Sequence, residues 1–105
     1  MSEKEIQKII LKAIKRHPYV AWAYTTSSGY VKGVNGGQMF RVGVPGMSDI
    51  MGQMKDGRLL AIEVKVPGKK PTELQMDFIQ LVNQYYGVGG WADNIETAIK
   101  IIEEA

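Results

Sequence analysis

The feature that most constrains the fold is a pair of extended segments joined by a short turn. Residues 48–54 and 58–66 are rich in apolar side chains, and the turn between them contains Asp56-Gly57. An Asp-Gly pair between two such segments is typical of a β-hairpin, because glycine tolerates the backbone conformation that a tight turn requires. We therefore predict an antiparallel strand pair in the middle of the chain.

Alternation along the second of these strands separates two kinds of side chain. Leucine, isoleucine and valine occupy positions 60, 62 and 64, while Glu63 and Lys65 occupy the intervening positions with Ala61. Successive side chains of a strand point to opposite faces, so the acid and the base share one face. They are either a solvated ion pair on an outer face, which contributes little to stability, or part of a site.

Asp49 makes a site the stronger interpretation. If the hairpin closes at Asp56-Gly57, Asp49 lies back alongside Glu63 and Lys65. Two carboxylates that converge on one point repel each other unless a proton or a cation joins them. Oxygen ligands of this kind suit Mg²⁺ or Mn²⁺. Asp49 as a mere strand-entry residue is the open alternative.

Three helices are expected around this hairpin. Ser2 with Glu5, and Thr72 with Gln75, have the spacing of capping boxes. The first helix ends at His17-Pro18 and the second at Gly87; the third begins where Asp93 and Glu96 cap it. The apolar positions expected to face the core from the second helix are Leu74, Phe78, Leu81, Val82 and Tyr85.

The remaining segments read as strands and turns. Residues 19–26 and 88–92 are predicted strands, and the glycine-rich segment 30–46 predicts an irregular hairpin or loop with a short strand at 39–42. The expected order is one helix, three or four strands, a helix, a strand and a helix. This predicts one α/β domain over residues 1–105, with a mixed central β-sheet flanked by helices.

Composition excludes several kinds of protein. A chain of 105 residues that is 45% hydrophobic is long enough for one core, and the absence of cysteine removes disulfides and thiolate chemistry. His17 is the single histidine, so no site can use two imidazoles. No apolar run is long enough for a membrane span, and the charged N-terminus does not resemble a secretory signal, so we expect a cytoplasmic protein with no membrane partner. The net charge of +2 does not by itself indicate nucleic-acid binding.

The acidic and basic residues together carry a family resemblance. Asp49, a gap of thirteen residues and then Glu63-Val64-Lys65 resembles the PD-(D/E)xK nuclease signature. Residues 43–50, residues 61–65 and Gln75 together resemble the VRR-NUC domain (virus-type replication-repair nuclease), over nearly the whole chain. Pro45 departs from the signature, because three residues separate it from Asp49, and this puts the role of Pro45 in doubt. The resemblance implies a restriction-endonuclease-like core in the order αβββαβα, of the stand-alone type found in phages and bacteria.

The resemblance also implies roles for the residues of the signature. Asp49 and Glu63 would bind Mg²⁺ or Mn²⁺, with the backbone carbonyl of Val64 as a further ligand. Lys65 would lie beside the attacking water.

Two helix residues complete the site that the resemblance implies. Gln75 would help to fix the lysine or the water, and Glu5 would reach the same pocket from the first helix. Each is also the third residue of a capping box, and a side chain that caps its own helix is not free for a pocket. Both roles stay open for each residue.

Substrate contacts are expected outside the signature. The candidate nucleic-acid-binding residues are Lys32, Arg41, Lys69 and Lys70. Tyr24, Tyr30 and Phe40 are candidates for stacking on bases, although a tyrosine on a strand, as at Tyr24, more often belongs to the core.

We therefore expect a metal-dependent DNA endonuclease that cuts branched DNA, such as four-way junctions, as a homodimer in the cytoplasm of a bacterial or phage-infected cell. The alternatives are a non-catalytic nucleic-acid-binding module of the same fold and a metal-dependent exonuclease.

Overall fold

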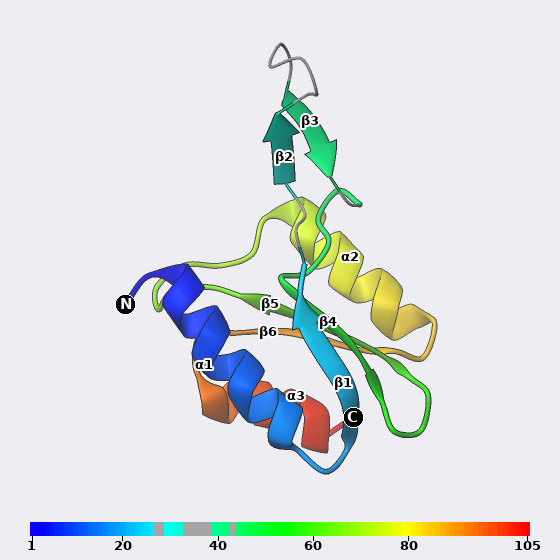
Figure 1. Cartoon of the computed structure of the whole chain (residues 1–105). Coiled ribbons are helices and arrows are strands. Elements are labelled where there is room, and N and C mark those ends of the chain that lie inside the picture. Colours follow the sequence, from blue (N-terminus) through cyan, green and yellow to red (C-terminus); the bar gives the residue numbers. More distant parts are fainter. Residues whose placement is uncertain (27–28, 33–38, 43) are drawn as a thin grey trace.

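The computed structural model describes residues 1–26, 29–32, 39–42 and 44–105, with the backbone alone at 29–32 and 39–42 (Figure 1). The helices are α1 (Glu3–Arg16), α2 (Glu73–Gln84) and α3 (Ile95–Glu103). The strands are β1 (Val20–Thr25), β2 (Gly29–Lys32), β3 (Met39–Val42), β4 (Ile50–Met54), β5 (Leu59–Val64) and β6 (Val88–Ala92). Five strands precede α2, so the prediction of three or four was wrong. The additional strand is β2, which pairs with the predicted strand at 39–42.

Four of these strands form a mixed sheet in the order β1-β4-β5-β6. β4 is antiparallel to both β1 and β5, whereas β5 and β6 are parallel and are connected through α2. β2 and β3 form a separate antiparallel ribbon that projects beyond one end of this sheet (Figure 1). The predicted α/β architecture, with a mixed sheet flanked by helices, is confirmed. Over the described residues, no helix is long and apolar enough to span a membrane.

The central hairpin forms as the Asp-Gly turn predicts. The Gly57 amide donates to the Met54 carbonyl at 2.9 Å, and Gly57 has a φ of +97°, which an L-residue rarely adopts. The register pairs Ile50 with Ile62. Asp49 precedes Ile50 and Glu63 follows Ile62, so Asp49 lies opposite Glu63.

The two faces of the sheet pack against different helices. Ile50, Leu60, Ile62 and Val64 are buried in the larger core with residues of α1 and α3. On the other face, a smaller cluster joins the sheet to α2; its buried members are Met51, Ala61 and Val82. Figure 1 shows α2 on the opposite side of the sheet from α1 and α3. Each fully buried leucine or isoleucine contributes about 1.5–3 kcal/mol.

Side chains cap all three helices, but one cap differs from the prediction. Ser2 and Thr72 cap α1 and α2 through the expected capping boxes. At α3 the cap is Asn94 and not Asp93, because the Asn94 side chain accepts from the Thr97 amide at 2.8 Å. Asn and Asp satisfy a helix N-terminus about equally well, so the sequence alone did not distinguish them.

The face of α2 that packs against the sheet also differs from the prediction. Leu74, Leu81 and Tyr85 were expected in the core but are exposed. Ile79 and Val82 are the buried residues of this helix, because α2 is turned so that they face β5 and β6.

The end of α2 has an unusual residue in its turn. The Gly87 amide donates to the Val82 carbonyl at 2.8 Å and the Tyr86 amide to the Asn83 carbonyl at 3.2 Å, the two bonds of a Schellman motif. Tyr86, and not a glycine, takes the left-handed conformation, with a φ of +68°. The helix thus ends just before Gly87, as predicted.

Candidate functional site

The start of β4 and the end of β5 bring two carboxylates together. Asp49 immediately precedes β4, and Glu63 is the penultimate residue of β5. Because antiparallel partners project to the same face, the two side chains lie on the face that carries Met51 and Ala61, toward α2. The predicted proximity of Asp49 and Glu63 is thus a consequence of the hairpin register.

Each carboxylate is held by a backbone amide of the other strand. The Asp49 amide donates to Glu63 Oε1 at 3.2 Å, and the Val64 amide donates to Asp49 Oδ2 at 2.9 Å. These two reciprocal bonds tie each acid to the strand opposite. The positions of both carboxyl groups therefore depend on the backbone and not on long flexible side chains alone.

Glu63 is buried with one oxygen unsatisfied. Its side chain is 1% exposed, and Oε2 has no hydrogen-bond partner among the described residues. Lys65 Nζ is the nearby cation, at 3.6 Å from this oxygen, and its side chain is 13% exposed. The alternative interpretation of Glu63 and Lys65 as a solvated ion pair on an outer face is therefore wrong for Glu63. Ser48, next to Asp49, is also fully buried, with its hydroxyl unpartnered within the described residues.

Burial and mutual repulsion favour protonation of this pair. Burial, followed by the negative charge of Asp49, raises the pKa of Glu63 to about 8. Burial also raises the pKa of Asp49, although hydrogen bonds from the Val64 amide and the Glu63 carboxyl oppose the shift. The pair therefore holds a proton near neutral pH when no other cation is present.

The donor set fits a hard divalent cation. Carboxylate oxygens are the preferred ligands of Mg²⁺ and Mn²⁺, and the orphaned Glu63 Oε2 is an oxygen for which the chain offers no hydrogen-bond donor among the described residues. Val64 contributes its amide to Asp49, which places its backbone at the cluster. In the part of the chain that the structure describes, no group of three acidic or histidine side chains gathers, so two carboxylates are the acidic ligands available.

Glu5 and Gln75 are occupied at their own helix ends. Glu5 Oε1 accepts from the Ser2 amide at 3.2 Å, and hydrogen bonding to Ser2 lowers the pKa of this exposed carboxyl. Gln75 Oε1 accepts from the Thr72 amide at 2.8 Å. The structure therefore shows the capping alternative for both side chains and does not bring either to Asp49.

The backbone nonetheless places the start of α2 close to the chain that leads into Asp49. Gly46 has a φ of +78°, and a Cβ atom built on it would lie 2.2 Å from the Leu74 carbonyl oxygen and 3.1 Å from the Gln75 nitrogen. Only glycine permits this approach. Gln75 thus lies on a helical turn that packs against the segment before β4, while its side chain points back to the cap.

The predicted nucleic-acid-binding residues fall in two places. Lys69 and Lys70 are exposed in the loop between β5 and α2, which begins directly after Val64. Lys32 and Arg41 belong to the β2–β3 ribbon, and their side chains lie outside the described residues.

Two aromatic residues of β1 differ from the sequence interpretation. Tyr24, a candidate for stacking for which a place in the core had the greater weight, is 52% exposed, and Trp22, which the sequence did not single out, is 46% exposed. A β-bulge between Val20 and Trp22 breaks the alternation of the strand. Val20 is therefore buried while Trp22 and Tyr24 face outward. Tyr30 and Phe40 have side chains outside the described residues.

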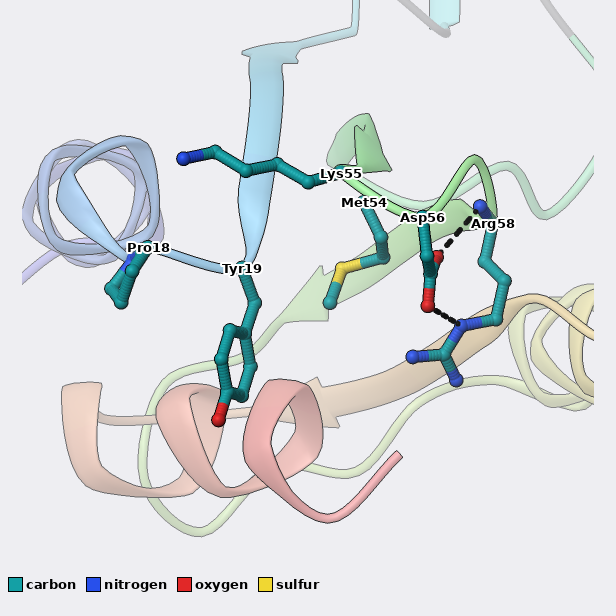
Figure 2. Close-up of a pocket in the computed structure, with 6 residues that line it drawn as sticks. All are labelled: Pro18, Tyr19, Met54, Lys55, Asp56 and Arg58. Atoms are coloured by element: carbon teal, nitrogen blue, oxygen red, sulfur yellow. Dashed lines mark hydrogen bonds and ion pairs between the residues drawn. The ribbon is translucent and has the colours of Figure 1, made fainter.

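A separate cavity of about 310 Å³ lies at the other end of the hairpin, beside its turn (Figure 2). Its only acidic lining residue, Asp56, is paired with Arg58 at 2.8 Å, and hydrogen bonds from Arg58 lower its pKa. Tyr19 extends along the same cavity toward α3, as Figure 2 shows. This cavity lacks converging unsatisfied acids and is not the candidate site.

Comparison with known proteins adds no relative: no family model, no curated protein and no solved structure matches this chain. The resemblance to the VRR-NUC domain therefore stays a prediction from sequence.

Proposed function

We propose that this protein is a divalent-metal-dependent nuclease, with Asp49 and Glu63 as the metal-binding carboxylates and Lys65 beside them. The observation that carries the proposal is Glu63, which is buried beside a second acid and has an oxygen left unpartnered within the described residues. Burying an acid next to another acid destabilises a fold unless a proton or a cation offsets the repulsion. Such a cation would also neutralise the charge of a phosphodiester substrate.

Each residue of the proposed site would have its own role in the reaction. Asp49 and Glu63 hold their oxygens fixed through the Val64 and Asp49 amides, so that little reorganisation is needed on binding. A bound Mg²⁺ or Mn²⁺ would neutralise the phosphate and acidify a water molecule. Lys65, mostly withdrawn from solvent, would supply a positive charge opposite the charge that develops on the phosphate. Lys69 and Lys70 would hold neighbouring phosphates from the adjoining loop.

The deciding experiment is cleavage of a panel of labelled DNAs: a four-way junction, a flap, a single strand and a blunt duplex. Each is incubated with Mg²⁺, Mn²⁺ or EDTA. We expect metal-dependent cleavage by the wild type and its loss in Glu63→Gln. Glu96→Gln, which changes an exposed acid of α3, is the matched control and should cut like the wild type. Inertness of the wild type on every DNA would contradict the proposal.

The same panel, with a circular DNA added, separates the alternatives that the sequence left open. DNA binding that persists in EDTA, with no cleavage in either metal, would indicate a non-catalytic binding module. Loss of activity on circular DNA, with activity retained on linear DNA, would indicate an exonuclease. The homodimer and the preference for four-way junctions stay predictions, and sedimentation with and without DNA tests the first of them.

A further inference from the structure

Trp22 and Tyr24 form an exposed aromatic pair that the proposed chemistry does not use. Their ring centroids are 5.5 Å apart and the planes differ by 15°, so the two rings stack. Both rings are about half exposed. The Trp22 Nε1–H group donates to Gln53 Oε1 at 3.0 Å, so the polar edge of the indole is satisfied. What the pair presents to solvent is mainly ring surface held in a fixed orientation.

The pair lies on the same sheet face as the acidic cluster. Trp22 pairs with Gln53 and Tyr24 with Met51, and Asp49 is two residues before Met51 on β4. Paired residues of neighbouring strands share a face, so both rings stand on the side of Asp49 and Glu63. The helix on that side, α2, packs mainly against β5 and β6, and among the described residues Trp22 and Tyr24 of the edge strand β1 stay about half exposed.

The register of β1 and β4 also determines how far Trp22 and Tyr24 lie from Asp49. Two residues along a strand span about 7 Å, and neighbouring strands lie about 5 Å apart. Tyr24 is therefore about 8 Å from Asp49 along the sheet, and Trp22 is about 14 Å from it. Successive nucleotides of a stacked strand rise about 3.4 Å, so these distances correspond to about two to four nucleotides.

We propose that Trp22 and Tyr24 form a stacking platform for unpaired bases of a single-stranded segment that adjoins the cleaved phosphodiester. The proposal rests on the nuclease function proposed above and names its substrate class. Bases within a duplex are already stacked on their neighbours, so an unpaired base lays its face on an aromatic ring far more readily than a base inside a duplex does. Trp22 stacks on one face of Tyr24, and the register places Asp49 on the other side of Tyr24 from Trp22. The substrate is thus DNA with a single-stranded segment beside the cut, and not a fully paired duplex.

Tryptophan fluorescence in EDTA tests the platform without any cleavage. The chain has two tryptophans, Trp22 and Trp91, so Trp91→Phe leaves Trp22 as the reporter. We expect a twelve-residue oligothymidylate to quench this emission, and a blunt hairpin duplex to bind at least tenfold more weakly. Tyr24→Ala should weaken binding of the oligothymidylate by about 5- to 150-fold, the range for loss of one stacked base. If Trp91→Phe fails to fold, the difference in quenching between wild type and Trp22→Phe gives the same measurement.

Tyr19→Ala is the matched control, because Tyr19 is a similarly exposed aromatic residue that lines the separate cavity at the other end of the hairpin. It should leave binding of the oligothymidylate unchanged. Equal quenching by the duplex, no quenching at all, or equal weakening by Tyr19→Ala would overturn the platform. So would sedimentation showing that Trp22→Ala separates a dimer of this chain while single-strand binding is retained.

The two proposals fail separately. If the wild type cuts no DNA but oligothymidylate still quenches Trp22, the nuclease function is wrong and the platform is supported. If the wild type cuts in Mg²⁺ and Trp22→Ala processes flaps and duplexes in the wild-type ratio, the nuclease function holds and the platform is wrong.

Discussion

Replacing Glu63 by glutamine should change the stability of this protein in a pH-dependent way. Glutamine has the shape of a protonated glutamate but cannot ionise. With the pKa of Glu63 raised from an ordinary value of 4.5 to about 8, the folded protein keeps this proton at neutral pH, whereas the unfolded chain has lost it. The unfolded state then binds fewer protons, so the free energy of unfolding falls as pH rises from about 4.5 to 8.

The size of the effect follows from one proton. The slope for the wild type cannot exceed about 1.4 kcal/mol per pH unit from this group, and Glu63→Gln removes it. We expect the variant to match the wild type most closely near pH 5 and to become relatively more stable at each step up to pH 8. Urea unfolding in EDTA at pH 5, 6, 7 and 8 measures the difference, with Glu96→Gln as the control. A difference between Glu63→Gln and the wild type that is constant across this range would refute the assignment of a buried, protonated Glu63.

A bound divalent cation should stabilise the wild type more than Glu63→Gln, the opposite of the order expected without metal. A cation at ten times its Kd stabilises the wild type by about 1.4 kcal/mol, which is a rise in Tm of about 6–11 °C for a domain near 100 residues. Glu63→Gln should lose most of this rise, because glutamine cannot offer a charged oxygen. Thermal scans with Mn²⁺ and with EDTA at pH 8 make the measurement. An equal rise in both proteins would mean that the cation binds elsewhere.

Three further results are expected. Apparent affinity for Mg²⁺ should rise up to about tenfold per pH unit between pH 6 and 8, because the cation displaces the proton of Glu63; calorimetric titration with no pH dependence would contradict this. Lys65→Met should keep cation binding in the same titration but lower the cleavage rate by about 10²–10³-fold, as loss of one group that stabilises the transition state does; a smaller loss would remove Lys65 from the reaction. Gly46→Ala should cost more than about 2 kcal/mol in urea unfolding, since its Cβ would collide with the Leu74 carbonyl; Gly57→Ala, strained in φ but in open space, is the control and should cost about 1–2 kcal/mol.

The proximity of Asp49 and Glu63 was predictable because local signals determine it. The Asp56-Gly57 turn fixes where the chain reverses, and counting back along both strands then pairs the two acids. The period of two assigns them to the same face. The hydrogen bond from the Val64 amide to the Asp49 carboxylate was not predictable, because it depends on the orientation of side chains at the end of a strand.

Trp22 was missed, and Tyr24 was given more weight as a core residue than as a stacking residue, for a specific reason. Strict alternation would place Trp22 and Tyr24 on the same face as Val20, and Val20 is a core residue. The bulge between Val20 and Trp22 reverses the faces beyond it, and a one-residue bulge leaves no reliable mark in the sequence.

The orientation of α2 needed tertiary information. Leu74, Leu81 and Tyr85 lie along one side of the helix and Ile79 and Val82 along another, so the helical period is compatible with burial of either side. Packing against the sheet determines which side of α2 is buried. Val82 fits against Met51 and Ala61, contacts that no local pattern encodes.

Folding alone gives no reason for a carboxyl group at position 63. Its neighbours Ile62 and Val64 are fully buried, and an apolar side chain of similar size would avoid both the desolvation of an acid and its repulsion by Asp49. A lysine at 3.6 Å offsets only part of that cost, and it leaves Oε2 without a hydrogen bond from any described residue. Perturbed acids that converge in this way are found preferentially at functional sites, where a proton or metal is exchanged. The energetic defect at Glu63 is therefore a stronger argument for a cation-dependent reaction than the spacing of the signature, because it depends on what the folded chain does with these residues.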